Sequence, residues 1–171
     1  MAEKYRILVI DDDEGIREVF STILRQRGYE VDTAHNATDA IEKSRSNLYH
    51  LALIDIRLPD MEGTKLLELL VDTTPKMKKI IVTGYPSLNN SVEALNQGAD
   101  GYIMKPVDAI TLVSMIEKHL NERRQNEHYA EEKVADFIKT RLKQVQMEPT
   151  PMTVEITKRT SRIPHATHKT K

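Results

Sequence analysis

The chain contains no cysteine among its 171 residues. This excludes a thiolate nucleophile, a disulfide framework and a thiolate zinc site, so a bound metal must use oxygen or imidazole ligands. Long apolar runs are missing too, because no stretch approaches the roughly 18 consecutive apolar residues that a membrane helix needs. The N-terminal stretch MAEKYRILVIDDD has neither the apolar core nor the cleavage site of a signal peptide. We therefore expect a cytoplasmic protein without membrane insertion.

Charge is unevenly distributed along the chain, although the formal net charge is only −1. Residues 123–171 hold eleven Lys and Arg against six Asp and Glu, and the part before them is acidic. The length suits one globular domain with an appendage. We predict a domain at residues 1–122, an amphipathic helical extension at 123–147 and a basic, Thr- and Pro-rich tail at 148–171 that is disordered.

Short β-branched runs alternate with segments of helical period, a pattern typical of an α/β fold with a doubly wound parallel sheet. The expected strands are 6–10, 29–34, 51–54, 79–82 and 102–104. The expected helices are 14–27, 37–46, a third containing Leu66 to Leu70, 88–97 and 108–120. Asn36 and Asp108 are suitable N-cap residues for two of them. The pattern therefore predicts a five-stranded parallel sheet, which we consider in the strand order 2-1-3-4-5, one of the common orders of doubly wound sheets.

The region after the predicted domain is more ambiguous. The polar stretch 121–127 either continues the last helix or forms a hinge. Residues 129–147 then resume a helical period, with one face formed by Ala130, Val134, Phe137, Ile138, Leu142 and Val145. This segment either folds back on the domain or extends its last helix, or it is a dimerisation or partner-docking helix.

Polar side chains follow four of the predicted strands. Parallel sheets carry their functional sites at the carboxyl ends of the strands, so these residues should be considered together. In the predicted strand order, the four strands are adjacent and their end residues converge. The converging residues are Asp11 and Asp12 after the first strand, Asp55 after the third, Thr83 after the fourth and Lys105 after the fifth. We assign Asp13 to the following helix N-terminus, where the macrodipole favours acids.

Clustered carboxylates repel one another unless a cation lies between them, which favours a hard divalent ion held by oxygen ligands. Mg²⁺ fits best, with Mn²⁺ as the alternative, because it accepts a few carboxylates, water and a phosphoryl oxygen. Beside such an ion, Asp55 is a suitable nucleophile towards a phosphoryl donor. Lys105 and Thr83 are suited to stabilise charge on the transferring group.

Four motifs occur in order and with consistent spacing: ILVIDDDEGIR at 7–17, LIDIRLPDMEG at 53–63, IIVTGY at 80–85 and ADGYIMKP at 99–106. In these motifs the sequence resembles the response-regulator receiver domains of two-component systems. The resemblance covers residues 5 to about 120. It implies a flavodoxin-like fold and a phospho-accepting signalling domain that catalyses only its own phosphorylation and dephosphorylation.

The resemblance also implies roles for individual residues. Asp55 would be the phosphoacceptor, while Asp12 would bind the metal directly and Asp11 through water. Arg57 would add its backbone carbonyl to the coordination, and its side chain occupies a position that modulates phosphate lifetime. Thr83 and Lys105 would contact phosphoryl oxygens, Tyr102 would be the aromatic switch residue, Gly84 would leave room for the donor, and the Lys105–Pro106 bond would be cis.

The implied partner upstream is a sensor histidine kinase or a phosphotransfer protein. Downstream, the state would pass to a protein partner or a second copy through the face of helix four, strand five and helix five, or through residues 129–147. The alternative is a DNA-associated transcriptional regulator that uses the basic tail, although a solvated tail is the favoured interpretation because no aromatic residues are interleaved there. A haloacid-type phosphatase is disfavoured because Arg57 stands where such enzymes have a second Asp. The six histidines show no metal-ligand spacing and are interpreted as surface residues.

Overall fold

The computed structural model describes residues 4–71 and 76–147, with side chains up to residue 143. The predicted tail at 148–171 lies outside the described residues. Strands and helices alternate along the chain as the sequence pattern predicts. They are β1 Arg6–Ile10, α1 Glu14–Gln26, β2 Glu30–Ala34, α2 Ala37–Ser46, β3 Leu51–Ile54, α3 Gly63–Leu69, β4 Lys78–Thr83, α4 Leu88–Asn96, β5 Gly101–Met104 and α5 Ala109–Met147.

The strands form one parallel sheet in the order β2-β1-β3-β4-β5, which confirms the predicted topology. In register, Ile7 of β1 pairs with Val31 of β2 on one side and with Leu51 of β3 on the other. Strand β3 is buried along its whole length. An almost unbroken apolar strand of this kind is expected where helices cover both faces of a parallel sheet.

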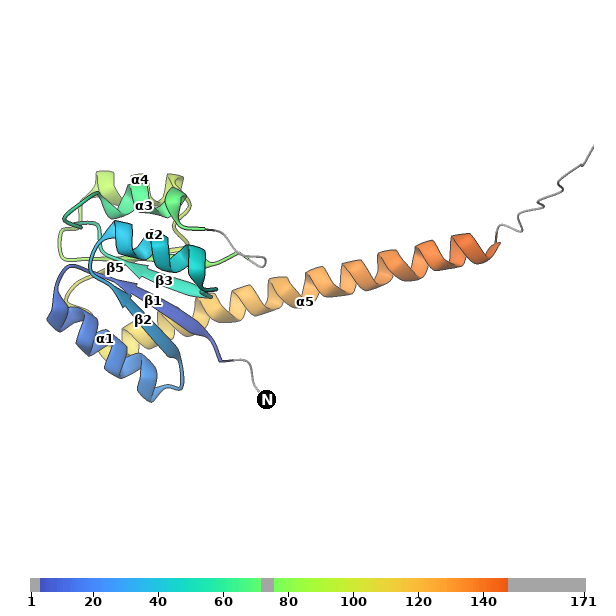
Figure 1. Cartoon of the computed structure of the whole chain (residues 1–171), viewed down its shortest axis with the longest axis horizontal. Helices are drawn as coiled ribbons and strands as arrows, with labels where there is room; N and C mark the ends of the chain where they lie inside the picture. Colours follow the sequence, from blue (N-terminus) through green and yellow to red (C-terminus); the bar gives the residue numbers. More distant parts are fainter. Residues whose placement is uncertain (1–3, 72–75, 148–171) are drawn as a thin grey trace, which may run out of the picture. The chain divides into compact units, whose positions relative to one another are not determined.

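Two helical layers cover the sheet (Figure 1). Helices α2, α3 and α4 pack on one face, and α1 packs with the first turns of α5 on the other. Alternation along β1 directs Leu8 and Ile10 into the first layer's core, and Ile7 and Val9 into the second. The sheet is thus held from both sides, while its edge at the carboxyl ends of the strands is left for polar residues.

Helix α5 runs without a break through the polar stretch 121–127, so of the two predicted alternatives the continuous helix is observed. The interpretation of His119 as a surface residue is wrong, because only 4% of it is exposed. Its Nδ1 atom lies 3.1 Å from Glu122 Oε2, and the Lys78 ammonium lies 3.6 Å from the same oxygen. Arg123 is buried as well. Ionic contacts thus hold this polar stretch of α5 against the domain.

The chain divides into two compact units, Met1–Lys133 and Val134–Lys171. The first contains the sheet and its covering helices. The described part of the second, up to Met147, is the end of α5. The division after residue 122 stays a prediction. In the described residues, no helix combines the length and the apolar character that crossing a membrane requires.

Candidate functional site

Backbone hydrogen bonds extend the strand ladders by one residue and thereby place the predicted site residues. The Asp11 N–H donates to the Ala34 carbonyl at 3.1 Å, and the Asp55 N–H donates to the Ile10 carbonyl at 2.9 Å. The Lys105 N–H donates to the Thr83 carbonyl at 2.8 Å. Because the strands are parallel and adjacent, all these residues emerge at the same edge of the sheet.

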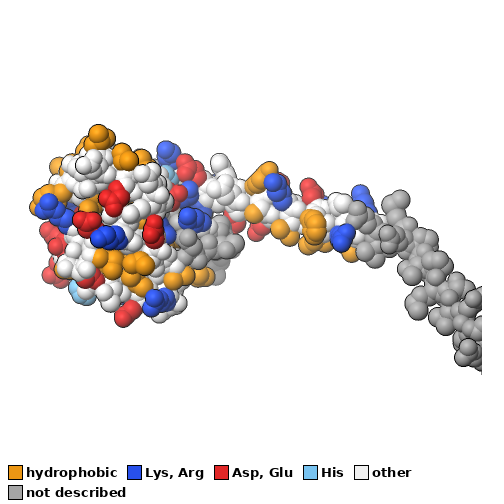
Figure 2. Space-filling view, turned by 90° about the horizontal axis from the view of Figure 1, so that it is seen from above, with side chains coloured by type: hydrophobic (Ala, Val, Ile, Leu, Met, Phe, Trp, Pro, Cys, Tyr) orange, Lys and Arg blue, Asp and Glu red, His pale blue; other side chains and the backbone are white. Residues whose placement is uncertain are grey.

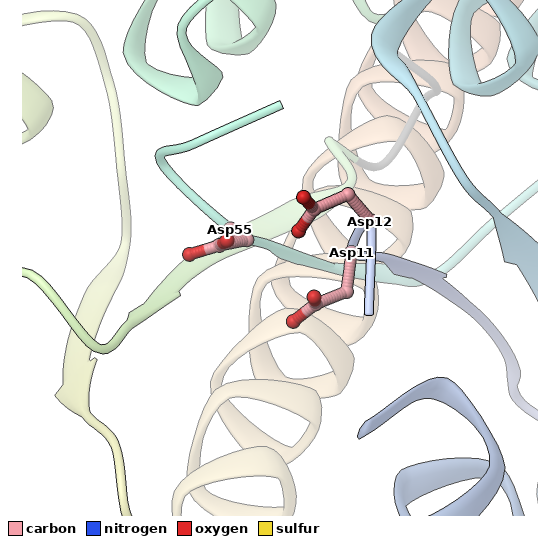
Figure 3. A group of neighbouring side chains, drawn as sticks. All are labelled: Asp11, Asp12 and Asp55. Carbon is pink, nitrogen blue, oxygen red and sulfur yellow. The ribbon is translucent and has the colours of Figure 1, made fainter. Parts of the chain in front are cut away.

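Three carboxylates meet at this edge (Figure 3). Asp11, Asp12 and Asp55 each contribute one oxygen to a group whose members lie within 4.8 Å of one another. Asp11 and Asp55 are buried, whereas Asp12 is exposed to solvent. The sequence prediction that these acids converge is therefore correct in geometry, and water has access to the cluster through Asp12.

The electrostatics of Asp55 reflect this crowding. Burial, which disfavours the charged form, raises the pKa of the Asp55 carboxyl above its usual value, and the neighbouring Asp11 carboxylate acts in the same direction. The Lys105 ammonium opposes the rise most strongly. Hydrogen bonds from the Ile56 amide and the Thr83 hydroxyl also lower this pKa.

Lys105 lies between the two buried acids. Its Nζ atom is 2.5 Å from Asp11 Oδ2 and 3.8 Å from Asp55 Oδ1. One ammonium beside three carboxylates leaves the described cluster with a net negative charge. Oxygen donors, excess negative charge and access for water together fit a hexacoordinate hard cation such as Mg²⁺, which retains several waters in protein sites.

Thr83 joins the cluster through a hydrogen bond to Asp55, whereas Tyr102 lies on the neighbouring strand. Thr83 is fully buried at the end of β4, and its hydroxyl accepts the Tyr85 N–H at 3.1 Å. Tyr102 is on β5, partly buried against the core that contains Ile81. With Leu88 and neighbouring residues, Tyr102 lines a hollow on the surface. The switch residue implied by the resemblance is thus placed between the core and that hollow.

Arg57 lies in the loop after β3, two residues beyond Asp55. It forms an isolated antiparallel bridge with Glu62, which closes the loop. Its guanidinium carbon lies 3.4 Å from the centroid of the Tyr85 ring, so its side chain turns towards the loop after β4. The Lys105–Pro106 bond in the loop after β5 is cis, as the resemblance implies.

Gly63 is a site residue at the end of the motif LIDIRLPDMEG, and the sequence alone indicates no role for it. Its N–H donates to the Ile56 carbonyl at 2.7 Å. A Cβ atom at this position would lie 2.0 Å from the Asp55 carbonyl oxygen, closer than real contacts allow. The absence of a side chain here therefore lets α3 begin directly against the backbone of Asp55.

Arg17 was also missed. Its Nη1 atom donates to the carbonyls of Asp11 at 2.7 Å and Asp12 at 3.0 Å, bracing the acidic loop from α1. The sequence feature that could have indicated this role is the position of Arg17, a cation in the first turn of the helix that follows the acids. Asp13 instead caps α1, because its Oδ1 accepts the Ile16 N–H at 3.2 Å, as its assignment to the helix N-terminus predicted.

Comparison with known proteins adds an independent line of evidence. The family model of the response regulator receiver domain matches residues 7–117. A receiver domain protein from Methanospirillum hungatei, described as CheY-like, is 48% identical, with a TM-score of 0.70 over 72% of this chain and 99% of that chain. A response regulator from Burkholderia pseudomallei, described with a phosphorylated aspartic acid and a calcium ion, is 29% identical with a TM-score of 0.63. That match covers 72% of this chain and 73% of the other.

Among curated proteins, the transcriptional regulatory protein ZraR of Klebsiella oxytoca is 36% identical over 125 residues. The match covers 73% of this chain but only 28% of ZraR. The chain thus spans little more than a quarter of the length of this relative.

Proposed function

Because the chain belongs to the family of response regulator receiver domains, we propose that Asp55 accepts a phosphoryl group from a phosphohistidine on a sensor kinase or a phosphotransfer protein. The observation that carries this proposal is the meeting of Asp11, Asp12 and Asp55 within 4.8 Å. The Lys105 ammonium beside them provides the positive charge that a transferring phosphoryl group requires.

The geometry around Asp55 suggests how the transfer proceeds. Asp55 Oδ1 accepts the Ile56 N–H at 2.9 Å and faces Lys105, so we assign the nucleophile to Oδ2. A bond forms between this oxygen and phosphorus as the phosphorus–nitrogen bond of the donor breaks, and the leaving imidazole takes up a proton. Lys105 and Thr83 then hold the new phosphoryl oxygens.

The carboxylates of Asp11, Asp12 and Asp55, with the backbone carbonyl of Arg57, are the groups that would hold Mg²⁺ here. The ion supplies positive charge that stabilises the transferring group. Asp11 in addition orients Lys105 through the ion pair between them. Arg17 holds the carbonyls of both acids and so fixes the loop on which they lie.

The output surface that we propose is formed by α4, β5 and the beginning of α5. Phosphorylation adds about −1.5 to −2 charge units at Asp55, and Lys105 and Thr83 move towards that charge. Tyr102, which lines the surface hollow and whose hydroxyl is already buried, shifts together with Thr83. Leu88, Met104 and Ile110 are more than half exposed on these elements and form an apolar surface suited to a protein partner. A change in the position of Tyr102 therefore alters the surface that the partner binds.

The test is the incorporation of acid-labile phosphate during incubation with acetyl phosphate and Mg²⁺. Wild type should be labelled and Asp55→Asn should not. Asp13→Asn is the matched control, because Asn caps a helix as well as Asp and the folded state is preserved. Equal labelling of wild type and Asp55→Asn would refute the assignment of the phosphoacceptor.

A DNA-associated role is a second candidate, favoured by the naming of ZraR as a transcriptional regulatory protein. The basic residues that would carry it lie at 149–171, outside the described part of the chain. Retardation of DNA by the full chain at low salt, lost on removal of residues 149–171, would support it. Equal retardation without these residues would exclude the tail as the DNA-binding segment.

A further inference from the structure

The end of α5 carries large apolar side chains that remain in solvent. Val134, Phe137, Ile138 and Leu142, which we call the apolar face, are between 51% and 68% exposed. Their spacing of three and four residues places them on one side of the helix. Figure 2 shows apolar side chains gathered along this part of α5. An amphipathic helix of this kind gains most of its stability when its apolar side is covered.

Charged residues along α5 indicate what covers this face. The acids Glu127, Glu131 and Glu132 precede the apolar face, and the bases Lys139, Arg141 and Lys143 lie along and just beyond its second half, with Lys133 and Asp136 as the exceptions. Two copies of the helix side by side in the same direction would place acids against acids and bases against bases. Two copies in opposite directions place the acidic stretch of each beside the basic stretch of the other.

We propose that a second copy of this chain covers the apolar face, through antiparallel pairing of two α5 helices. In the register that matches both patterns, Val134 of one copy lies opposite Ile138 of the other. The same register brings Glu131 opposite Arg141, twice in the symmetric dimer. The pairing involves neither Asp55 nor the metal site, so it stands or falls independently of the proposed phosphorylation.

Sedimentation equilibrium of the full chain, from roughly 1 to 100 μM, tests the proposal. The apparent mass should rise towards twice that of the monomer, and Asp55→Asn should associate like wild type. The double variant Val134→Gln with Ile138→Gln should weaken association at least tenfold, while Gln preserves helix propensity. Leu48→Gln is the control, because Leu48 is 73% exposed on the first unit. A wild type that stays monomeric, or a double variant that dimerises like wild type, would overturn the proposal.

Charge reversal tests the antiparallel direction. Glu131→Lys alone and Arg141→Glu alone should each weaken the dimer roughly tenfold, because two attractive pairs become repulsive. Combining both changes in one chain should restore association. A parallel dimer would be insensitive to the single changes, and that result would overturn the antiparallel pairing. Co-sedimentation of a monomeric wild type with phosphatidylglycerol vesicles would assign the apolar face to a lipid surface and overturn the proposal as well.

Discussion

The guanidinium carbon of Arg57 lies 3.4 Å from the centroid of the Tyr85 ring. Each residue stands two positions beyond a residue of the site, Arg57 after Asp55 and Tyr85 after Thr83. The contact joins the loop after β3 to the loop after β4 at the edge of the acidic cluster. An exposed cation–π contact contributes about 0.5 to 1 kcal/mol, enough to favour a closed arrangement of these two loops.

Loss of this contact should shorten the lifetime of the phosphate on Asp55, because water reaches the site more easily when the two loops separate. Arg57→Ala and Tyr85→Ala should each speed the decay by a factor of about 2 to 5. The measurement is the decay of acid-labile phosphate after the donor is removed. Tyr85→Phe keeps the ring and should decay like wild type. A double variant whose effect is the product of the single effects would show that the contact does not act as a unit.

Gly63→Ala adds only one methyl group, but it should lower both the stability of the protein and its rate of phosphorylation. The new Cβ would lie 2.0 Å from the Asp55 carbonyl oxygen, so the backbone that carries the nucleophile must shift. We expect a loss of about 1 to 3 kcal/mol in unfolding free energy and a further drop in the phosphorylation rate of the folded protein. Thermal unfolding should be measured on the same samples as phosphorylation, with the phosphorylation assay run well below the melting temperature.

Gly84→Ala is the matched control for this change. A Cβ there would have the Lys105 Cδ atom as its nearest neighbour at 3.9 Å, an ordinary van der Waals contact. Its stability should therefore stay close to that of wild type. If Gly63→Ala is phosphorylated at the wild-type rate, the close contact with Asp55 has no role in positioning the nucleophile.

Asp12→Asn should stabilise the protein without metal and remove most of its response to Mg²⁺. In the absence of metal, the three carboxylates repel one another and the folded state is destabilised. For wild type, Mg²⁺ at ten times its dissociation constant should add about 1.4 kcal/mol to the unfolding free energy. Calorimetric melting of both proteins, with and without Mg²⁺, gives the comparison. Asp13→Asn should keep the full Mg²⁺ response, and its loss there would mean that Asp13 belongs to the metal site.

Much of the fold follows from local pattern. The unbroken apolar run of β1 predicts a central strand, because only a strand covered on both faces can bury Ile7 and Leu8 together. The site follows from the same reasoning, since a parallel sheet with this strand order must bring Asp11, Asp55 and Lys105 to one edge. The proximity of these residues could be predicted from the sequence, whereas the distances between them are known only from the structure.

Other features depend on contacts that sequence spacing does not encode. The polar stretch around Glu122 packs against the domain through Lys78, which is distant in sequence and whose ammonium lies 3.6 Å from the Glu122 carboxylate. The approach of Gly63 to Asp55 depends on how the loop after β3 closes. The stacking of Arg57 on Tyr85 joins two loops whose conformations are set by tertiary packing. In each case the determining partner lies on another element, beyond any local window.

Asp60 is a titratable residue that helps to hold the loop after β3 in place. Its carboxylate accepts the Ala37 N–H at 2.9 Å, and the N–H and hydroxyl of Thr38 at 2.8 and 2.7 Å, which ties the loop to the start of α2. Burial raises the pKa of Asp60, but these hydrogen bonds together outweigh it and lower the pKa to about 2. The unfolded chain, whose Asp pKa is about 3.9, therefore binds this proton at higher pH than the folded protein.

The stability that Asp60 contributes should accordingly be complete above about pH 4 and be lost as the pH falls towards 2. Because Asp60 is exposed, we expect about 1 kcal/mol after allowance for solvent screening. Asp60→Asn should lower the unfolding free energy at pH 7 by this amount and flatten its decline between pH 4 and 2. Urea unfolding at several pH values measures both effects, with Asp136→Asn on the exposed end of α5 as the control. An unchanged slope in Asp60→Asn would show that the decline arises from other carboxyl groups.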